Sequence, residues 1–227
     1  MCGRYMLTSP VDALRQLFRF EQRPNLMPRY NIAPTQDVPI VRLTQDATAR
    51  ELLMVRWGLV PFWADDLKGG ARLINARCET VQRIRPFREA YQRRRCLVPA
   101  DGFFEWRKDG KSRQPFLFLR KDRAPFAFAG LWERWREPSD GTVVRSCTII
   151  TCPANAVVAP LHDRMPVILA PDDHERWLDP ADDARGLLVP CPAAWLESTA
   201  VNARVNSPNY DDPECIQPPV VQNTLDL

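Results

Sequence analysis

The stretch CLVPADGFFEWR (residues 96–107) opens the part of the chain that is richest in strand-forming residues. Residues 96–99 and 103–107 both carry β-branched or aromatic side chains over lengths that suit β-strands. The same composition recurs in three more runs of strand length, at residues 116–120, 126–131 and 148–151. The middle of the chain is therefore predicted to form a β-sheet.

The N-terminal part adds strands and a first helix. Residues 38–41 and 52–55 are predicted strands joined by a polar turn. Apolar residues at helical spacing predict a short amphipathic helix over residues 10–20. Three further helices are expected, at residues 78–95, 154–160 and 172–178. Pro86 is a point at which the first of these can break.

These elements predict a single α+β domain. The chain has 227 residues, no internal repeat and no linker long or polar enough to divide it. We expect a curved antiparallel sheet, or a β-barrel-like core, with short helices on its periphery. The domain is predicted to span residues 1–216. Residues 217–227, with two prolines and little apolar periodicity, are predicted to be a loose C-terminal tail.

The composition is typical of a globular protein and not of a membrane or secreted one. Hydrophobic residues make up 45% of the chain and charged residues 26%, which is ordinary for a soluble globular protein. No apolar run approaches the roughly 20 residues that cross a bilayer. The N-terminus lacks the basic-then-apolar pattern of a signal peptide. We therefore expect a cytoplasmic protein with no membrane partner.

The basic residues are mostly arginines, whose planar guanidinium suits phosphate. The net charge of +3 says little by itself. Arg83, Arg85, Arg88 and the run at residues 93–95 form a strongly basic stretch, which taken alone is predicted to be a solvated helix face. The seven cysteines include no C-x-x-C pair, so most are predicted to be buried as small hydrophobic residues. No metal and no cofactor is expected.

Cys2 follows the initiator methionine, and removal of Met1 would make it the N-terminal residue. We expect this removal because the second residue is small. The product would carry an α-amine with a pKa of roughly 7.7–8.0 next to a thiol with a pKa of about 8.5. Gly3 would let a ligand approach the backbone closely. The alternative is that a cysteine at position 2 is incidental to a frayed terminus.

Two reactions suit such a terminus. In amide hydrolysis the thiolate attacks a carbonyl while the α-amine acts as base, as in N-terminal nucleophile hydrolases. In aldehyde capture the amine forms a Schiff base, and the thiol then closes onto it to give a five-membered thiazolidine ring. The second product requires a 1,2-aminothiol, which only an N-terminal cysteine provides.

Asn75 and Glu105 are candidate partners of this terminus. Asn75 can orient an amine or a carbonyl without titrating, although it is equally a plausible cap at the end of a strand. Glu105 lies among bulky aromatic residues in the segment GFFEW, where desolvation would raise its pKa and suit it to acid–base catalysis. The alternative is an alternating strand on which Glu105 faces water.

His162 is one of only two histidines in the sequence. It lies in the segment LHDRMP, in a predicted turn between a helix and a strand, where functional residues concentrate. Asp163 would hold its tautomer, and Arg164 would meet a phosphate. His174, which has acidic neighbours, is predicted to be exposed in the first turn of a helix and is given no role.

Six blocks of the sequence resemble one known family and occur in its order. They are CGRY (residues 2–5), YNIAPT (30–35), WGLVP (57–61), INARCET (74–80), GFFEW (102–106) and HDRMP (162–166). The chain is thereby similar to the SOS-response-associated peptidase (SRAP) family of abasic-site processing proteins. Residues 205–206 resemble the last short motif, so the resemblance covers nearly the whole chain. Phe103 stands where the family often has tryptophan.

The resemblance implies the SRAP fold and a protein that crosslinks itself to abasic sites in single-stranded DNA, whose ring-opened sugar is an aldehyde. Cys2 would form the thiazolidine, and Asn75 would position its amine. Glu105 would move protons during formation and reversal of the link. His162 would protonate the sugar oxygen as the ring opens, and would assist strand scission if the Schiff base acts as an AP lyase.

The resemblance also implies a DNA path and a self-peptidase. The expected DNA-binding residues are Gly3, Arg4, Arg77, Trp106, Thr151 and Arg164, whose arginines would grip phosphates beside the lesion. The domain itself would remove Met1. The protein would act as a monomer on single strands, or at their junctions with duplex, and would shield the lesion during the DNA damage response.

Two other functions are weighed against this one. A hydrolase of the class-II glutamine amidotransferase type also begins Met-Cys-Gly, but it would need an Asn-Gly pair in its oxyanion hole. No asparagine in this chain is followed by glycine. A non-enzymatic binder of single-stranded DNA would use the arginines and aromatic residues, but it would leave Cys2 unexplained.

Overall fold

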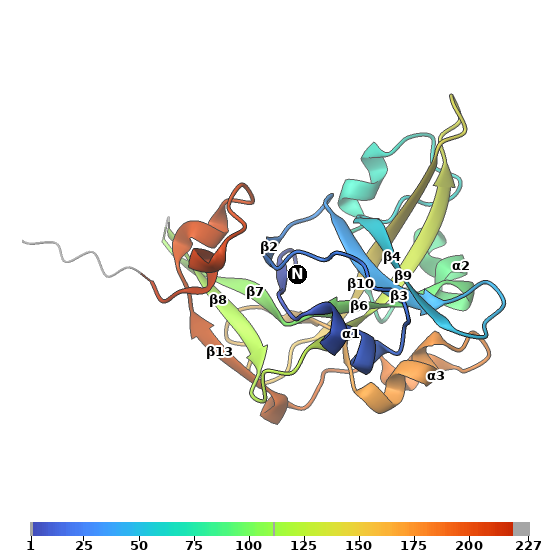
Figure 1. Ribbon diagram of the computed structural model, residues 1–227. Coiled ribbons are helices and arrows are strands. Elements are labelled where there is room, and N and C mark those ends of the chain that lie inside the picture. Colours follow the sequence, from blue (N-terminus) through green and yellow to red (C-terminus); the bar gives the residue numbers. More distant parts are fainter. Residues whose placement is uncertain (1, 111, 220–227) are drawn as a thin grey trace, which may run out of the picture.

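The computed structural model describes residues 2–110 and 112–219 (Figure 1). Its strands form one sheet of five strands and one of eight. The β-rich middle of the chain is confirmed. Its five strands follow one another along the chain as β6 (Arg95–Ala100), β7 (Gly102–Asp109), β8 (Ser112–Arg120), β9 (Phe126–Arg136) and β10 (Val143–Pro153).

Five strands of the larger sheet close into a barrel. Its antiparallel pairs are β3 (Asp37–Leu43) with β4 (Arg50–Trp57), β3 with β6, β6 with β9, and β9 with β10. The ring closes where β10 lies parallel to β4, with Ser146 opposite Arg56. Gly130 lets β9 lie against β6, because a Cβ there would be 2.7 Å from a methyl group of Val98.

Three short strands extend this sheet. β5 (Asn75–Arg77) lies parallel to β10, β11 (Arg164–Pro166) lies antiparallel to the last residues of β10, and β12 (Ile168–Leu169) pairs with β9. β5 carries Asn75, and β11 begins just after His162. The C-terminal end of β10 is therefore the place where two segments with candidate chemistry meet.

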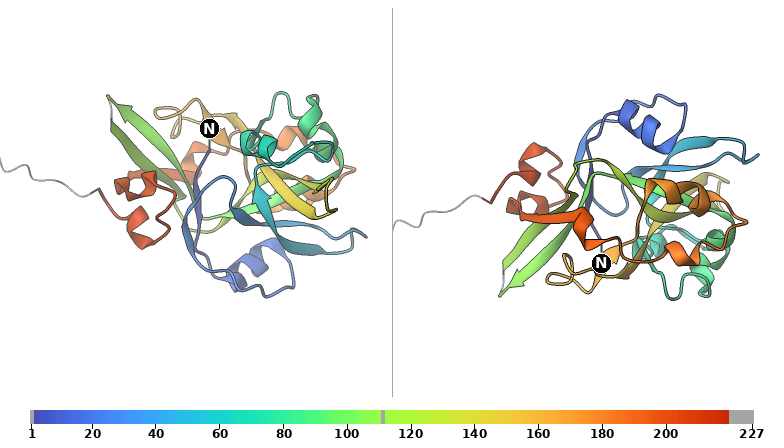
Figure 2. Two further views of the ribbon diagram at one scale, coloured as in Figure 1. Left: turned by 90° about the horizontal axis from the view of Figure 1, so that it is seen from above. Right: turned by 90° about the horizontal axis from the view of Figure 1, so that it is seen from below.

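The smaller sheet brings the N-terminal segment to the strand that carries Glu105. Its order is β13 (Leu196–Ala200), β8, β7, β1 (Tyr5–Leu7) and β2 (Arg29–Ile32). The chain leaves the barrel at Gly102, where a Cβ would lie 2.8 Å from the carbonyl oxygen of Phe118. In Figures 1 and 2 the start of the described chain lies between the β7–β8 hairpin and the barrel.

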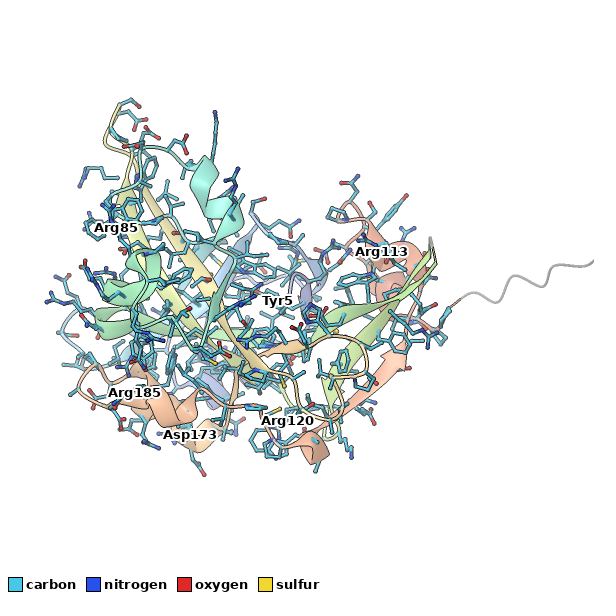
Figure 3. The ribbon with its side chains drawn as sticks, turned by 180° about the vertical axis from the view of Figure 1, so that it is seen from behind. Tyr5, Arg85, Arg113, Arg120, Asp173 and Arg185 are labelled. Atoms are coloured by element: carbon cyan, nitrogen blue, oxygen red, sulfur yellow. The ribbon has the colours of Figure 1, made fainter. Side chains whose placement is uncertain are left out.

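Buried aromatic rings connect β1 to the barrel. Tyr5 packs edge-on against Trp57 and Phe128, with ring centres 5.3 and 5.7 Å apart. Figure 3 shows Tyr5 in the middle of the molecule. Burying one large apolar side chain stabilises a fold by roughly 1.5–3 kcal/mol, and all three of these are buried. This packing fixes the residues just after Cys2 in place.

The helices lie outside the barrel and match the predictions in part. α1 (Val11–Phe18) confirms the first predicted helix. Of residues 78–95, only α2 (Arg85–Arg93) is helical, and Pro86 lies in its first turn. A proline is tolerated there because the first helical N–H groups have no partner within the helix. Pro86 therefore begins this helix and does not break one.

The helix predicted at residues 154–160 is wrong, because this segment forms turns. The side-chain oxygen of Asn155 accepts the N–H groups of Val157 and Val158 at 3.1 and 3.2 Å. Such local bonds compete with helix formation. The last predicted helix is confirmed as the 3-10 helix η2 (Pro171–Asp173) followed by α3 (His174–Leu178).

The predicted exposure of His174 is wrong. Its side chain is only 1% exposed and stacks on Phe18, with ring centres 5.4 Å apart. Trp177 and Leu178, three and four residues further along α3, are buried with it. Residues at this spacing share one helix face, so His174 belongs to the apolar face of α3 and not to the acidic one.

Five more 3-10 helices surround the sheets. They are η1 (Lys68–Arg72), η3 (Ala184–Leu187), η4 (Ala193–Trp195), η5 (Ala203–Asn206) and η6 (Pro213–Ile216). The predicted α+β class is confirmed, as a single domain with a barrel core and short peripheral helices. No helix among the described residues is long and apolar enough to cross a membrane. Of the predicted tail, Gln217 accepts the Asn202 N–H at 2.8 Å, and residues 220–227 lie outside the described residues.

Candidate active site

Cys2 is completely buried at the start of the described chain. The next residues are tied to β7, since the carbonyl of Arg4 accepts the N–H of Phe104 at 3.0 Å and Tyr5 lies opposite Phe103. The Cys2 thiol donates a long bond of 3.9 Å to the Arg4 carbonyl. This segment is therefore held in a fixed position and is not frayed.

Asn75 holds Cys2 from the barrel side. Its Nδ2 donates to the carbonyl oxygen of Cys2 at 2.7 Å. Asn75 lies opposite Ile149 on β10, and the preceding carbonyl of Ile74 accepts the Trp57 indole N–H at 2.9 Å. The side-chain oxygen of Asn75 is buried and has no hydrogen-bond partner within the described ranges. This arrangement leaves a buried acceptor beside the N-terminal segment.

Glu105 is buried on β7, so the alternative in which it faces water does not hold. The strand does alternate, but Phe104 and Trp106 pack into a separate cluster with Met6 on the other face. Burial, together with the nearby charge of Asp163, raises the pKa of Glu105 to about 7. At neutral pH the carboxyl group is therefore divided between its two protonation states, as a proton shuttle requires.

The Cys2 thiol is protonated in this environment. Burial, followed by the charge of Glu105, raises its pKa well above the ordinary value. A thiolate is thus disfavoured until something changes around the sulfur. Of the two nucleophiles that an N-terminal cysteine carries, this setting favours the amine for the first attack on an electrophile.

His162 lies in the turn that precedes β11. Its Nδ1 accepts the backbone N–H of Arg164 at 2.9 Å, so in the neutral ring Nε2 carries the proton. The carboxylate of Asp163 is also 2.9 Å from Nδ1, but the two groups would pair only if the ring were protonated. Partial burial lowers the pKa of His162, which favours the neutral ring. The tautomer is therefore set by the backbone and not, as expected, by Asp163.

The three arginines expected to grip phosphates have different surroundings. Arg4 is half-buried and donates to the side-chain oxygen of Asn31 at 2.7 Å and to the Val205 carbonyl at 2.8 Å. Arg77 is exposed on β5 and forms no ion pair with any described residue. Arg77 is thus the arginine of the three most available to an incoming phosphate.

The guanidinium of Arg164 is engaged by the protein. It makes a two-pronged contact with Glu79, at 2.5 and 3.0 Å, and donates to the carbonyl of Thr151 at 2.7 Å. Its side chain is 11% exposed. Arg164 therefore fastens β11 to the end of β10, and it would have to exchange Glu79 for a phosphate in order to bind DNA.

The remaining predicted DNA contacts surround the N-terminal segment. Gly3 is half-buried between Cys2 and Arg4. Trp106 is partly buried, and its indole N–H donates to Asn206 at 2.6 Å. Thr151 is buried, and its hydroxyl donates to the carbonyl of Ala76 at 3.3 Å, so its side chain holds β5 against β10 and does not reach the surface.

Two supporting residues received no role from the sequence. Asn31 is fully buried, accepts from Arg4 and donates to the carbonyls of Ser207 and Tyr210 at 3.0 and 2.6 Å. Glu79 neutralises Arg164 across 85 positions of sequence. Both lie inside the resembling blocks, but their partners are distant in the chain, so no local pattern could have indicated these roles.

The described residues contain no group of three or more His, Cys, Asp or Glu side chains that could hold a metal ion. All seven cysteines are present as free thiols, and six of them are buried. The candidate residues are therefore a buried cysteine at position 2, an asparagine bonded to its carbonyl, a buried carboxyl and a histidine with a defined tautomer.

Residues 1–208 match the family model described as SOS response associated peptidase (SRAP). The chain is 40% identical to Abasic site processing protein YoqW of Bacillus subtilis (strain 168), over 96% of this chain and 99% of the relative. It is 33% identical to Abasic site processing protein YedK of Escherichia coli (strain K12), over 78% and 79% of the two chains. A crystal structure of a protein from Bacteroides thetaiotaomicron is also similar, with a TM-score of 0.82, 28% identity and coverage of 96% of this chain and 99% of that one.

Proposed function

This chain belongs to the SOS response associated peptidase (SRAP) family, and from that premise we propose that it processes abasic sites in single-stranded DNA by crosslinking itself to them through Cys2. The observation that supports this most is the environment of Cys2. Asn75 holds the Cys2 peptide at 2.7 Å and presents a buried acceptor, while burial gives Glu105 a pKa of about 7.

The reaction begins with removal of Met1, which exposes the α-amine of Cys2. We assign this cleavage to the domain itself, as the family's description as a peptidase suggests. Asn75 Oδ1 then accepts a hydrogen bond from the amine. That contact directs the nitrogen lone pair toward the incoming aldehyde and satisfies the buried oxygen.

The amine attacks first and the thiol second. As the C1′–O4′ bond of the abasic sugar breaks, the Nε2–H of His162 donates a hydrogen bond to O4′, and O4′ takes up the proton that the C1′ hydroxyl releases on becoming the aldehyde. The amine adds to C1′ and water leaves, which gives a Schiff base. The Cys2 sulfur then bonds to C1′ while its proton passes to the nitrogen through Glu105, which closes the thiazolidine ring. The same steps in reverse release the DNA.

Strand scission is the competing outcome at the Schiff-base stage. Loss of a proton from C2′, beside the imine, would expel the 3′ phosphate, which is AP-lyase chemistry, and we assign assistance of this step to His162. Closure of the thiazolidine removes the imine and so prevents scission. The protein would in this way shield the lesion, acting as a cytoplasmic monomer on single strands or at their junctions with duplex.

The DNA path runs past Arg77. Arg77 is exposed with no ion pair among the described residues, and Trp106 offers a partly exposed ring beside Arg4. Single-stranded DNA binders combine arginines for phosphates with aromatic rings for bases. The raised pKa of the Cys2 thiol disfavours the amidohydrolase alternative, which depends on a thiolate from the start.

A gel experiment tests the proposal. Protein lacking Met1 is incubated with a single-stranded oligonucleotide that carries one abasic site, and a heat-stable adduct is expected. Neither Cys2→Ala nor an oligonucleotide with a reduced abasic site, which has no aldehyde, should give an adduct. An adduct of equal yield with Cys2→Ala would contradict the proposal, as would its complete absence with the native protein.

A further inference from the structure

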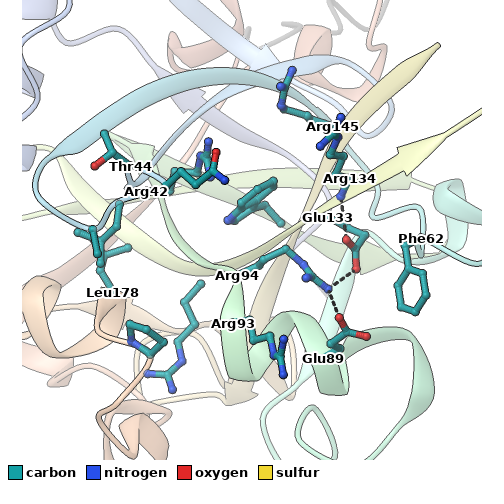
Figure 4. A pocket seen from close by; sticks show the side chains of 16 residues that line it. Arg42, Thr44, Phe62, Glu89, Arg93, Arg94, Glu133, Arg134, Arg145 and Leu178 are labelled. Atoms are coloured by element: carbon teal, nitrogen blue, oxygen red, sulfur yellow. Dashed lines mark hydrogen bonds and ion pairs between the residues drawn. The ribbon is translucent and has the colours of Figure 1, made fainter. Parts of the chain in front are cut away.

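A pocket of about 570 Å³ lies at the end of the barrel away from the candidate active site (Figure 4). It is lined where β3 and β9 end and where β6 and β10 begin, for example by Arg42 and Arg145. The candidate active site lies near Thr151, at the opposite end of β10. Thr151 lies six positions after Arg145 along β10, which corresponds to roughly 20 Å. The two sites are therefore separate.

Positive charge dominates the lining of this pocket, which we call the barrel-end pocket. Six arginines contribute to it: Arg42, Arg93, Arg94, Arg95, Arg134 and Arg145. The acidic residues of the lining are Glu89 and Glu133, and both are bonded to Arg94, at 3.3 and 2.9 Å. For Arg93, Arg134 and Arg145 no ion pair exists with any residue in the two described ranges.

Arg134 and Arg145 lie directly opposite each other on β9 and β10. Like charges in this position destabilise an antiparallel pair. Both side chains are exposed, and Figure 4 shows them together at one side of the pocket. Such a pair adds nothing to the stability of the fold, and both arginines are open to an anion that would relieve their repulsion.

Two further arginines of the lining, Arg42 and Arg95, carry positive charge and are held in place by contacts within the protein. Arg42 lies over the ring of Trp132, with its guanidinium carbon 4.2 Å from the ring centre, and pairs with Glu51 at 2.6 Å. Arg95 is buried, and its guanidinium donates to backbone carbonyls, including that of Asp182 at 2.9 Å. The expectation that residues 93–95 form a solvated face is thus wrong for Arg95, whose charge stays within the barrel end.

We infer that the barrel-end pocket binds the phosphate group of a nucleotide, presented either by a DNA strand or by a free nucleotide. Arginine forks match phosphate oxygens in pairs. Phe62, 52% exposed in the lining, offers a ring on which a base can stack. The pocket volume lies within the 300–1,000 Å³ typical of small-ligand sites. This inference is independent of the chemistry at Cys2.

The test compares the double variant Arg134→Gln/Arg145→Gln with the control Arg23→Gln/Arg123→Gln. The control removes two exposed arginines that lie outside the pocket, with side chains 70% and 60% exposed. Three probes are titrated by calorimetry: inorganic phosphate, deoxyadenosine monophosphate, and an oligonucleotide of about twenty nucleotides without an abasic site. The melting temperature of each protein and its crosslinking yield with abasic DNA at saturation are also measured.

We expect the pocket variant to lose about tenfold in affinity for at least one probe, while the control does not. A loss for phosphate and the mononucleotide would identify a free nucleotide as the ligand. A loss for the oligonucleotide alone, with its salt slope smaller by about 1.4, would identify a DNA strand. Equal affinities of both variants for all three probes would overturn the inference.

Two further readouts keep the result interpretable. The melting temperature of the pocket variant should be unchanged or higher, because a repulsive pair has been removed. A clear decrease would show that the two arginines serve the fold. Crosslinking at saturation should be unchanged, so that failure of this inference and failure of the proposed Cys2 chemistry can be told apart.

Discussion

The Nδ2 atom of Asn75 donates a 2.7 Å hydrogen bond to the carbonyl oxygen of Cys2, although 73 positions separate the two residues. The bond fixes the peptide that follows the nucleophile, and it directs the other end of the amide, Oδ1, into the buried site without a partner among the described residues. One side chain can thus hold the backbone of Cys2 and also receive its amine once Met1 is removed.

Asn75→Ala should slow crosslinking more than it weakens the fold. Loss of one hydrogen bond costs about 1 kcal/mol of stability, whereas loss of the contact that orients the amine should reduce the crosslinking rate by about 100-fold. The rate is measured by quenched gel assay and the stability by urea unfolding. Asn209→Ala, at an exposed position, is the control. Equal rates for the two variants would rule out a role for Asn75 in orienting the amine.

Cys2→Ser should form an adduct that reverses more readily than the native one. The hydroxyl can close only an oxazolidine, in which oxygen replaces sulfur and the ring opens more easily. The measurement is release of the oligonucleotide over time in the presence of excess competitor DNA. If the Cys2→Ser adduct persists as long as the native adduct, the link is not a thiazolidine.

Arg77→Gln should weaken the binding of single-stranded DNA and reduce the salt slope of log K by about 0.7, because one phosphate contact is lost. Arg123→Gln removes the same charge at a distant exposed position and should change neither quantity. Arg164→Gln is expected to act differently, by lowering the melting temperature, because Arg164 joins Glu79 to the end of β10. If Arg77→Gln binds like the control, the DNA path lies elsewhere.

Composition and short-range spacing were sufficient for the strands of the barrel and for α1. They could not show the parallel pairing of β4 with β10, because the paired residues Arg56 and Ser146 are far apart in the sequence. They also misplaced His174, whose acidic neighbours suggested a solvated helix. The correct signal was the spacing to Trp177 and Leu178, which belongs to a buried helix face.

For the candidate site, too, the local sequence predicted some features, whereas others depend on residues that are distant in the chain. The sequence predicted a desolvated Glu105, but its closeness to Cys2 depends on β1 pairing with β7. The contact between Arg164 and Glu79 decides that this arginine is already engaged, and nothing near either residue in the sequence reveals it. What the sequence could not supply in each case was a partner brought in from a distant segment.

Glu105→Gln should change the dependence of the crosslinking rate on pH. The native rate should rise as the pH passes through about 7, because the carboxylate form of Glu105 accepts protons from the amine and the thiol. In the variant the rate at pH 7 should fall by about 100-fold, and the remaining rise should follow the amine at roughly pH 8. Glu197→Gln, at an exposed position, is the control. A native profile that is flat between pH 6 and 8 would exclude Glu105 as the proton carrier.

Glu105 and His174 should influence the free energy of unfolding with opposite sign. Burial raises the pKa of Glu105 to about 7 and lowers that of His174 to about 4. Between pH 5 and 6 the folded chain holds a proton on Glu105 that the unfolded chain has largely released, so this residue makes stability fall as pH rises. His174 is neutral in the folded chain but protonated in the unfolded chain, so it makes stability rise with pH. Each slope is at most about 1.4 kcal/mol per pH unit, and the two nearly cancel.

Single variants should therefore reveal slopes that the native protein hides. In urea unfolding at pH 5 and 6, Glu105→Gln should become more stable with rising pH, and His174→Phe, which preserves the stacking on Phe18, should become less stable. The double variant should return to the shallow native dependence. If both single variants keep the native slope, neither group has the displaced pKa that its burial implies.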